Sequence, residues 1–171
     1  MTHLPIIIAP DPILKAKAKP VARVDARVRQ LLDDMLETMY ADRGIGLAAP
    51  QVGISERLVV IDTAHEDEPA TPLFLVNPEI LWRSPETTIC NEGCLSLPEY
   101  FADITRAEQV RVRYTDRDDK TQDITADGML AICLQHEIDH LEGKLFVDYL
   151  SPMKRSIILR KLRRFKSGEG K

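Results

Sequence analysis

The sequence has few of the features that mark secreted and membrane proteins. It contains only three cysteines among 171 residues, an odd number, so a framework of disulfides is not expected. No stretch approaches the roughly 18 consecutive apolar residues of a membrane-spanning helix. The first residues, MTHLPIIIAPDPILK, lack a basic start followed by a long apolar run. We therefore expect no signal peptide, no membrane contact and a cytoplasmic location.

Long runs of one charge are also missing, with one exception near the C-terminus. Residues 154–166, the basic segment, hold seven lysines and arginines and no acid, although the net charge of the whole chain is −4. The remainder is therefore acidic, which argues against nucleic acid, and against specific DNA binding, as the main ligand. With 44% hydrophobic and 29% charged residues, the composition is that of a globular protein, and the length predicts one domain over residues 1–171.

Apolar residues at three- and four-residue steps predict helices at the start, centre and end of the chain. The first is a long helix within residues 21–42, whose apolar positions are Val24, Val28, Leu31, Leu32, Met35 and Met39. The second follows Asp127, a suitable N-cap, and ends at Gly143. The third begins at Ser151-Pro152 and contains the basic segment.

The segments between these helices show strand patterns and no alternating βαβ units. RLVVID (57–62) has the uninterrupted apolar run of a buried strand, and LFLVNPEILW (73–82) is a strand region broken at Asn77-Pro78. QVRVRYTDRDDKTQDIT (109–125) alternates around a polar turn, which predicts a hairpin. GIGLAAPQVG (44–53) is expected to be a loop. Together these patterns predict an α+β fold with mixed or antiparallel sheets packed around the central helix.

The central helix carries His136-Glu137-Ile138-Asp139-His140, an H-E-x-x-H motif. Residues four apart lie on one face of a helix, so both imidazoles can reach one metal ion. Glu137 points elsewhere and stays available as a base. The alternative is a surface helix with two incidental histidines, but the glutamate and the preceding Gln135 favour the metal site.

A metal needs at least one further ligand, and the patterns of zinc proteases do not supply it. Phe146 occupies the position of a third histidine in one pattern, and no carboxylate lies between Asp148 and Glu169 to serve another. The remaining candidates lie upstream: His3, His65, Cys90, Cys94 and Cys133. Cys94 is favoured because it stands in the turn-like segment NEGCLSLP, where Gly93 permits a close approach of the backbone. A thiolate with two imidazoles leaves a position open for water.

Two other classes of protein stay open at this point. Cys90 and Cys94 could join the two histidines in a closed Cys2His2 site of a zinc-stabilised binding module. However, 41 residues separate Cys94 from His136, where small zinc fingers have about a dozen. A metallopeptidase would share the H-E-x-x-H motif but lacks a third ligand of its usual kind.

Three stretches together resemble the motifs of peptide deformylase, in particular of the bacterial type I enzymes. They are GIGLAAPQ (44–51), EGCLS (92–96) and QHEIDH (135–140), in that order and at plausible spacing. The resemblance implies a hydrolase that removes the formyl group from the N-formylmethionine of nascent polypeptides and releases formate. It also implies one divalent ion per chain, Fe(II) natively, with zinc or nickel able to occupy the site.

The resemblance also assigns roles to individual residues. Metal-bound water attacks the formyl carbon, with Glu137 as general base and then acid. The side-chain amide of Gln51 and the backbone N–H of Leu95 donate to the oxygen on which charge develops. The metal ligands implied are Cys94, His136 and His140.

A further set of residues is expected to bind the substrate. The backbone of Gly44, Ile45 and Gly46 would lie along the peptide in β-like fashion, and Gly93 allows it to approach. Around the methionine side chain the resemblance places Ile45, Glu92, Met129, Ile132 and Cys133. For Met129 and Ile132, packing in the protein core is an equal alternative. Preference beyond the formylated residue is left open, because family members are expected to differ at Phe101 and around Tyr100.

Asp139 and the basic segment can each be interpreted in more than one way from the sequence. Asp139 could orient a ligand histidine or pair with a base such as Arg106, or it could be a solvated surface residue. In the basic segment, Ile158, Leu162 and Phe165 form an apolar stripe that could pack on the domain. Alternatively, the segment could dock on the ribosome, as in similar deformylases, and such binding would depend strongly on salt.

Overall fold

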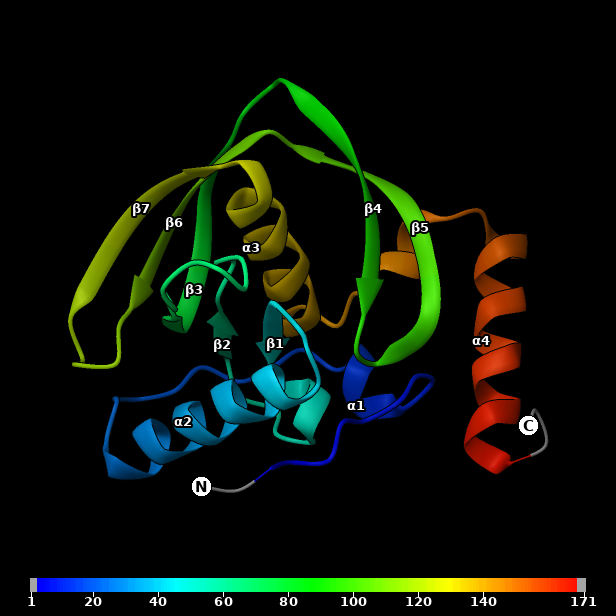
Figure 1. Cartoon of the computed structure of the whole chain (residues 1–171), viewed down its shortest axis with the longest axis horizontal. Coiled ribbons are helices and arrows are strands. Elements are labelled where there is room, and N and C mark those ends of the chain that lie inside the picture. Colours follow the sequence, from blue (N-terminus) through cyan, green and yellow to red (C-terminus); the bar gives the residue numbers. More distant parts are fainter. Residues whose placement is uncertain (1–2, 169–171) are drawn as a thin grey trace.

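A computed structural model of the chain describes residues 3–168, so the predicted domain extends beyond it by residues 1–2 and 169–171 (Figure 1). The helices are α1 (Pro12–Lys15), α2 (Ala26–Ala41), α3 (Gly128–Leu141) and α4 (Pro152–Ser167), with 3-10 helices η1 (Ala49–Val52) and η2 (Phe146–Tyr149). The strands are β1 (Gly46–Ala48), β2 (Leu58–Ile61), β3 (Leu73–Arg83), β4 (Thr87–Cys94), β5 (Leu97–Ala107), β6 (Gln109–Thr115) and β7 (Thr121–Asp127).

The strands form two antiparallel sheets around one central helix. One sheet has the order β1-β2-β3-β6-β7, and the other consists of β4 and β5. In Figure 1, α3 runs through the middle, with the larger sheet on one side and the β4–β5 hairpin on the other. The predicted α+β class is confirmed.

Helix α3 is held in this position by its own side chains. Ten of its 14 residues are buried, and Ala131, Cys133, Leu134, Ile138 and Leu141 pack into one cluster with apolar residues of the larger sheet. Each fully buried leucine or isoleucine stabilises the fold by about 1.5–3 kcal/mol. The polar residues of α3 are buried by the same packing, which brings them next to the two sheets.

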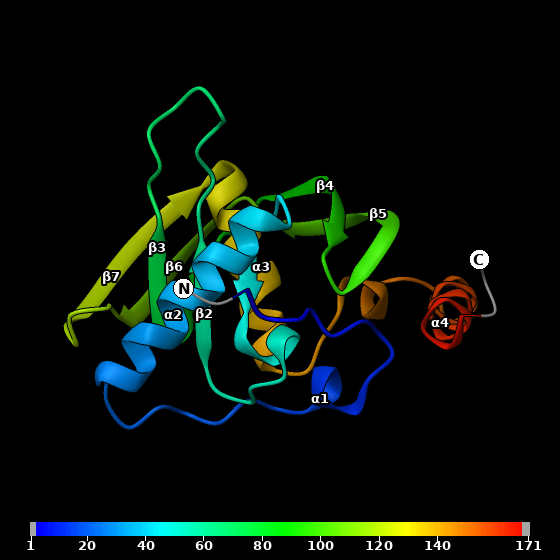
Figure 2. The same ribbon diagram turned by 60° about the horizontal axis from the view of Figure 1, so that its bottom comes forward.

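Helices α2 and α4 lie further out, within the segments predicted to be helical. Asp25 caps α2 by accepting a hydrogen bond from the Val28 N–H, and the Ser151 hydroxyl accepts one from Lys154 N–H at the start of α4. Turned by 60°, the molecule shows α4 end-on at its edge (Figure 2). No helix within residues 3–168 is long and apolar enough to cross a bilayer.

Several local predictions were wrong. The supposed loop 44–53 contains strand β1 and helix η1, because Gly46–Ala48 pairs with the edge of β2. Asn77-Pro78 does not end the strand: β3 continues through a bulge there. Asn77 adopts a positive φ of 52°, and its side chain exchanges two hydrogen bonds with the backbone of Val21. Asp127 is the N-cap residue of α3, as predicted, but its side chain makes no capping hydrogen bond.

Candidate metal centre and substrate cavity

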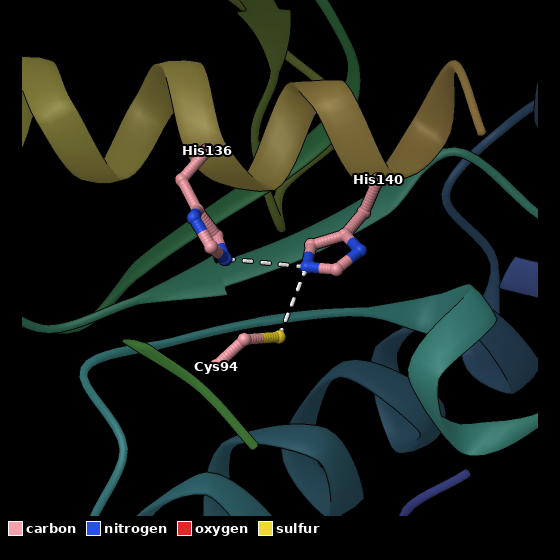
Figure 3. Close-up of side chains that lie close together, drawn as sticks. All are labelled: Cys94, His136 and His140. Atoms are coloured by element: carbon pink, nitrogen blue, oxygen red, sulfur yellow. Dashed lines mark hydrogen bonds between the residues drawn. The ribbon is translucent and has the colours of Figure 1, made fainter. Parts of the chain in front are cut away.

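Three predicted ligands converge in the interior of the molecule. His136 and His140 stand one turn apart on α3, and Cys94 ends strand β4, directly before the turn into β5. The Nε2 atoms of the two histidines are 3.3 Å apart, and Cys94 Sγ lies 3.4 Å from His140 Nε2. Figure 3 shows the sulfur and both rings pointing toward one another across the gap between α3 and β4.

These distances fit three ligands of one tetrahedral ion. With metal–nitrogen bonds of about 2.05 Å and a metal–sulfur bond of about 2.3 Å, tetrahedral geometry separates two nitrogens by about 3.3 Å and sulfur from nitrogen by about 3.5 Å. The ligand atoms of Cys94, His136 and His140 all lie within 4.8 Å of one another, and they form the one such cluster found among the described residues. The group can therefore hold a metal, with a thiolate and two imidazoles as donors.

His136 is oriented from behind by a buried carboxylate. Its Nδ1 lies 2.8 Å from Glu92 Oε1, so that donation of the Nδ1 proton leaves the Nε2 lone pair directed at the metal position. Burial alone would raise the pKa of Glu92, but hydrogen bonds from Arg106 and His136 outweigh it and lower this pKa to about 2. Glu92 is therefore a carboxylate at any physiological pH.

Arg106 and Asp139 extend this network, which removes the interpretation of Asp139 as a surface residue. Arg106 holds Glu92 through two hydrogen bonds of 2.8 and 2.9 Å, and donates a third, of 2.7 Å, to Asp139. The Tyr149 hydroxyl donates to the same Asp139 oxygen at 2.6 Å, and its ring lies 4.9 Å from the Arg106 guanidinium carbon. Burial and then Asp139 raise the pKa of Tyr149 to about 12. The buried charges are thus paired and hydrogen-bonded.

Cys94 accepts a hydrogen bond from a neutral side chain, the amide of Gln51. Gln51 is buried, and its amide nitrogen donates to Cys94 Sγ at 3.3 Å and to the Ser96 hydroxyl at 3.1 Å. Its amide oxygen accepts from the Ala48 N–H at 3.0 Å, which fixes the orientation of the amide. His140 Nδ1, in contrast, has no partner among residues 3–168.

Glu137 lies beside the ligands, and one oxygen of its carboxylate has no hydrogen-bond partner among residues 3–168. Its Oε2 lies 3.9 Å from His136 Nε2, while Oε1 has no hydrogen-bond partner in the described part of the chain. Burial raises the pKa of Glu137 to about 7, against the opposing effect of His136. A carboxylate with a free oxygen and a pKa near neutrality is suited to accept and return a proton.

A cavity of about 440 Å³ opens next to this group. All the residues predicted to bind substrate line it: Gly44, Ile45, Gly46, Glu92, Gly93, Met129, Ile132 and Cys133. Gln51, Leu95 and Glu137 also line it. Met129 is half exposed, so it borders the cavity and does not fill the core. Glu92 lines the cavity as well, while its carboxylate is hydrogen-bonded to His136 and Arg106.

Comparison with known proteins agrees with this geometry. A family model described as polypeptide deformylase matches residues 3–156. The chain belongs to the polypeptide deformylase family. It is 53% identical to a peptide deformylase from Bartonella henselae, over 96% of this chain and 93% of the relative. A deformylase from Methylocella silvestris is 54% identical, over 92% and 82%.

Solved deformylase structures show the same fold. The structure of the deformylase from Ehrlichia chaffeensis has a TM-score of 0.93 and 40% identity, and covers 98% of this chain and 99% of that one. The deformylase from Legionella pneumophila has a TM-score of 0.90 and 46% identity, with 99% of both chains covered. The resemblance seen in the three motifs is confirmed, as is the enzyme class. The binding module and the metallopeptidase find no support.

The other candidate ligands lie apart from the cluster. Cys90 is partly exposed on β4, and Cys133 lines the cavity with a pKa raised by burial. His65 is exposed, and His3 lies 3.3 Å from Asp42. The distances therefore favour Cys94 among all the upstream candidates.

Some residues near the metal centre were not predicted from the sequence. Ser96, fully buried, accepts from Gln51, and Tyr149 was not singled out at all. Arg106 was named only as a possible partner of Asp139, and that pair is confirmed at 2.7 Å; its two hydrogen bonds to Glu92 were not predicted. No pattern in the sequence indicates Tyr149, whose contact with Asp139 depends on the position of η2.

Proposed function

We propose that this protein removes the formyl group from N-formylmethionine at the start of nascent polypeptides, in a single catalytic domain. The observation that carries the proposal is the convergence of one thiolate and two imidazoles at 3.3–3.4 Å, with the Glu137 carboxylate beside them at the inner end of an apolar cavity. When bound, a divalent ion, Fe(II) natively with zinc or nickel as substitutes, supplies Lewis-acid activation of water and of the formyl carbonyl.

Glu137 carries the proton in this proposal. Glu137 lines the cavity and its Oε1 has no hydrogen-bond partner among residues 3–168, so the carboxylate can accept a proton from the attacking water and later donate it to the departing amine. Burial raises its pKa to about 7, so Glu137 is suited both to accept and to return a proton near neutral pH. Formate and a free N-terminal methionine are the products.

Gln51 and Leu95 supply donors for the developing negative charge on the formyl oxygen. Both line the cavity beside Cys94. The Gln51 amide donates to Cys94 Sγ and Ser96 before substrate arrives, so it must exchange one of these hydrogen bonds for the formyl oxygen. This exchange keeps the amide satisfied throughout and avoids a buried donor without a partner.

The formylated residue is held by strand pairing and by an apolar pocket. One edge of β4 is paired with β5, and no described strand pairs with the other edge, where Glu92 and Gly93 line the cavity. An extended peptide can add to this edge, opposite Gly44–Gly46. Its first side chain then enters the space between Met129, Ile132 and Cys133 of α3, which suits methionine.

A comparison of two products tests the proposal. Protein purified without oxygen and analysed for metal is expected to release formate from formyl-Met-Ala-Ser and to leave the peptide bonds intact. A solved relative from Ehrlichia chaffeensis binds actinonin, so the same compound is expected to inhibit this enzyme. Cleavage between residues of the peptide without formate would contradict the proposal.

The ligand set has its own test. Cys94→Ala is expected to abolish metal binding and activity, whereas Cys90→Ser retains about one metal per chain, because Cys90 lies outside the cluster. Metal content measured by mass spectrometry distinguishes them. Loss of metal from Cys90→Ser would instead favour a closed site.

We also propose that α4 contacts the ribosome in the cytoplasm, where nascent chains emerge. Leu162 is buried, while the seven cations of the basic segment remain at least partly exposed. Leu162 and Ile158 thus pack on the domain, whereas Phe165 stays half exposed and the cations remain accessible. Replacing Arg160, Lys161, Arg163 and Arg164 with glutamine should weaken co-sedimentation with ribosomes at low salt without disturbing the fold. Unchanged co-sedimentation would exclude α4 as the contact.

A further inference from the structure

We propose that Phe101 selects an apolar side chain at the second residue of the substrate, directly after the formylmethionine. The inference rests on the proposed function and refines it, by adding a substrate preference to the reaction. Two observations support it: the side chains of strand β4 alternate between two faces, and the exposed ring of Phe101 lies on one of them.

The two faces of β4 are defined by neighbouring residues. The Glu92 side chain points toward α3, where it meets His136 at 2.8 Å. Gly93 faces the other way: a Cβ built on Gly93 would lie 2.4 Å from Cε1 and 2.6 Å from Cδ1 of Phe101. Phe101 is the cross-strand partner of Gly93 on β5, so its ring covers this second face.

A peptide added to the free edge of β4 continues the same two faces, because side chains alternate along every strand of a sheet. The formylated residue directs its side chain toward α3, where Met129, Ile132 and Cys133 line the cavity. The next residue must then direct its side chain to the opposite face. That is the face on which the Phe101 ring lies.

The Phe101 side chain is free to make this contact. It lines the cavity and is 64% exposed, although it is large and apolar. An apolar side chain at the second position would cover part of this exposed ring, whereas glycine would leave it in water. Gly93 is needed for the arrangement, because any larger residue would push the ring away from the strand.

The effect is measured as the ratio of kcat/KM for two peptide substrates. With formyl-Met-Leu-Ser and formyl-Met-Gly-Ser, the wild-type kcat/KM is expected to favour leucine about tenfold. Phe101→Ala should reduce this ratio to about two, and Phe101→Leu, which keeps an apolar surface, should retain most of it. The control is Ile89→Ala, because Ile89 is 69% exposed on the same hairpin but does not line the cavity.

The ratio is taken within each variant, so a smaller fraction of folded or metal-loaded enzyme does not alter it. An unchanged ratio in Phe101→Ala, or an equal loss in Ile89→Ala, would overturn the role of Phe101 while formate release still supports the proposed function. Absence of formate with both peptides would instead overturn the proposed function itself.

Discussion

Helices α3 and α4 have similar lengths, 14 and 16 residues, but they are stable for different reasons. In α3 ten residues are buried, including two histidines and two acids, whereas of the described α4 residues Leu162 alone is buried. The polar groups of α3 had to be matched by partners from β4, β5 and η2. Most cations of α4 are exposed to solvent, and among residues 3–168 only Arg155 and Lys166 have an acidic neighbour, Asp148 and Asp11, each at 3.8 Å.

The difference between the two helices indicates which polar groups take part in the reaction. Buried polar groups in proteins are nearly always hydrogen-bonded, so the exceptions are informative. On α3 the exceptions within the described chain are Glu137 Oε1 and His140 Nδ1. His140 belongs to the ligand cluster, and Glu137 lies beside it in the lining of the cavity. Four substitutions or conditions test this contrast, beginning with the largest expected effect.

Replacement of Glu137 with glutamine should have the largest effect, because it removes the proton carrier and keeps the shape. We expect kcat to fall by about 10³-fold, with metal content unchanged. Glu142→Gln, at the exposed C-terminal end of the same helix, should retain nearly full activity. Near-normal turnover by the Glu137 variant would exclude this residue as the base.

Removal of the Arg106 charge should come next. Arg106→Leu leaves Glu92 and Asp139 buried without their counter-ion, which is expected to lower the free energy of unfolding by about 3–5 kcal/mol. Metal should dissociate about 10–100-fold more readily, since His136 loses its support. Denaturant unfolding and competition with a chelator measure the two effects. Arg111→Leu, which breaks an exposed pair with Asp123, is the control and should change stability little.

Two adjacent residues of α4 sharpen the contrast within one helix. Leu162→Ala should lower the free energy of unfolding by about 2–3 kcal/mol, because Leu162 is only 1% exposed. Arg163→Ala, at an exposed position, should leave it nearly unchanged. Equal effects in thermal unfolding would mean that α4 is not docked on the domain.

A smaller effect is expected from pH. Glu137 must be ionised to accept a proton, and burial raises its pKa to about 7, so kcat/KM should fall as the pH decreases through this region. A bound cation favours the ionised form and moves the acid limb to lower pH. The pH profile should therefore show one protonation with a midpoint at or below about 7. A midpoint clearly above this value would assign the limb to another group.

The helices and the metal ligands could be predicted from the sequence, but strand β4 and most of the hydrogen bonds around the ligands could not. Helical periodicity placed α2, α3 and α4, and the H-E-x-x-H spacing follows from one helical turn. Strand β4 was not predicted, because TTICNEGC lacks a regular alternation of apolar and polar residues. The pair of Asp139 with Arg106 was one of the alternatives drawn from the sequence, but the contacts of Arg106 with Glu92 and of Tyr149 with Asp139 join distant elements, about which local patterns carry no information.

Gly46 limits the space available to the Glu137 side chain beside the metal centre. A Cβ at this position would lie 2.6 Å from Glu137 Oε2, closer than atoms can approach. The methyl group of an alanine at this position would contact the Glu137 side chain first, so Gly46→Ala is expected to displace the carboxylate. Strand β1 and helix α3 therefore depend on each other at this point: the missing side chain of Gly46 leaves the space that the Glu137 carboxylate occupies.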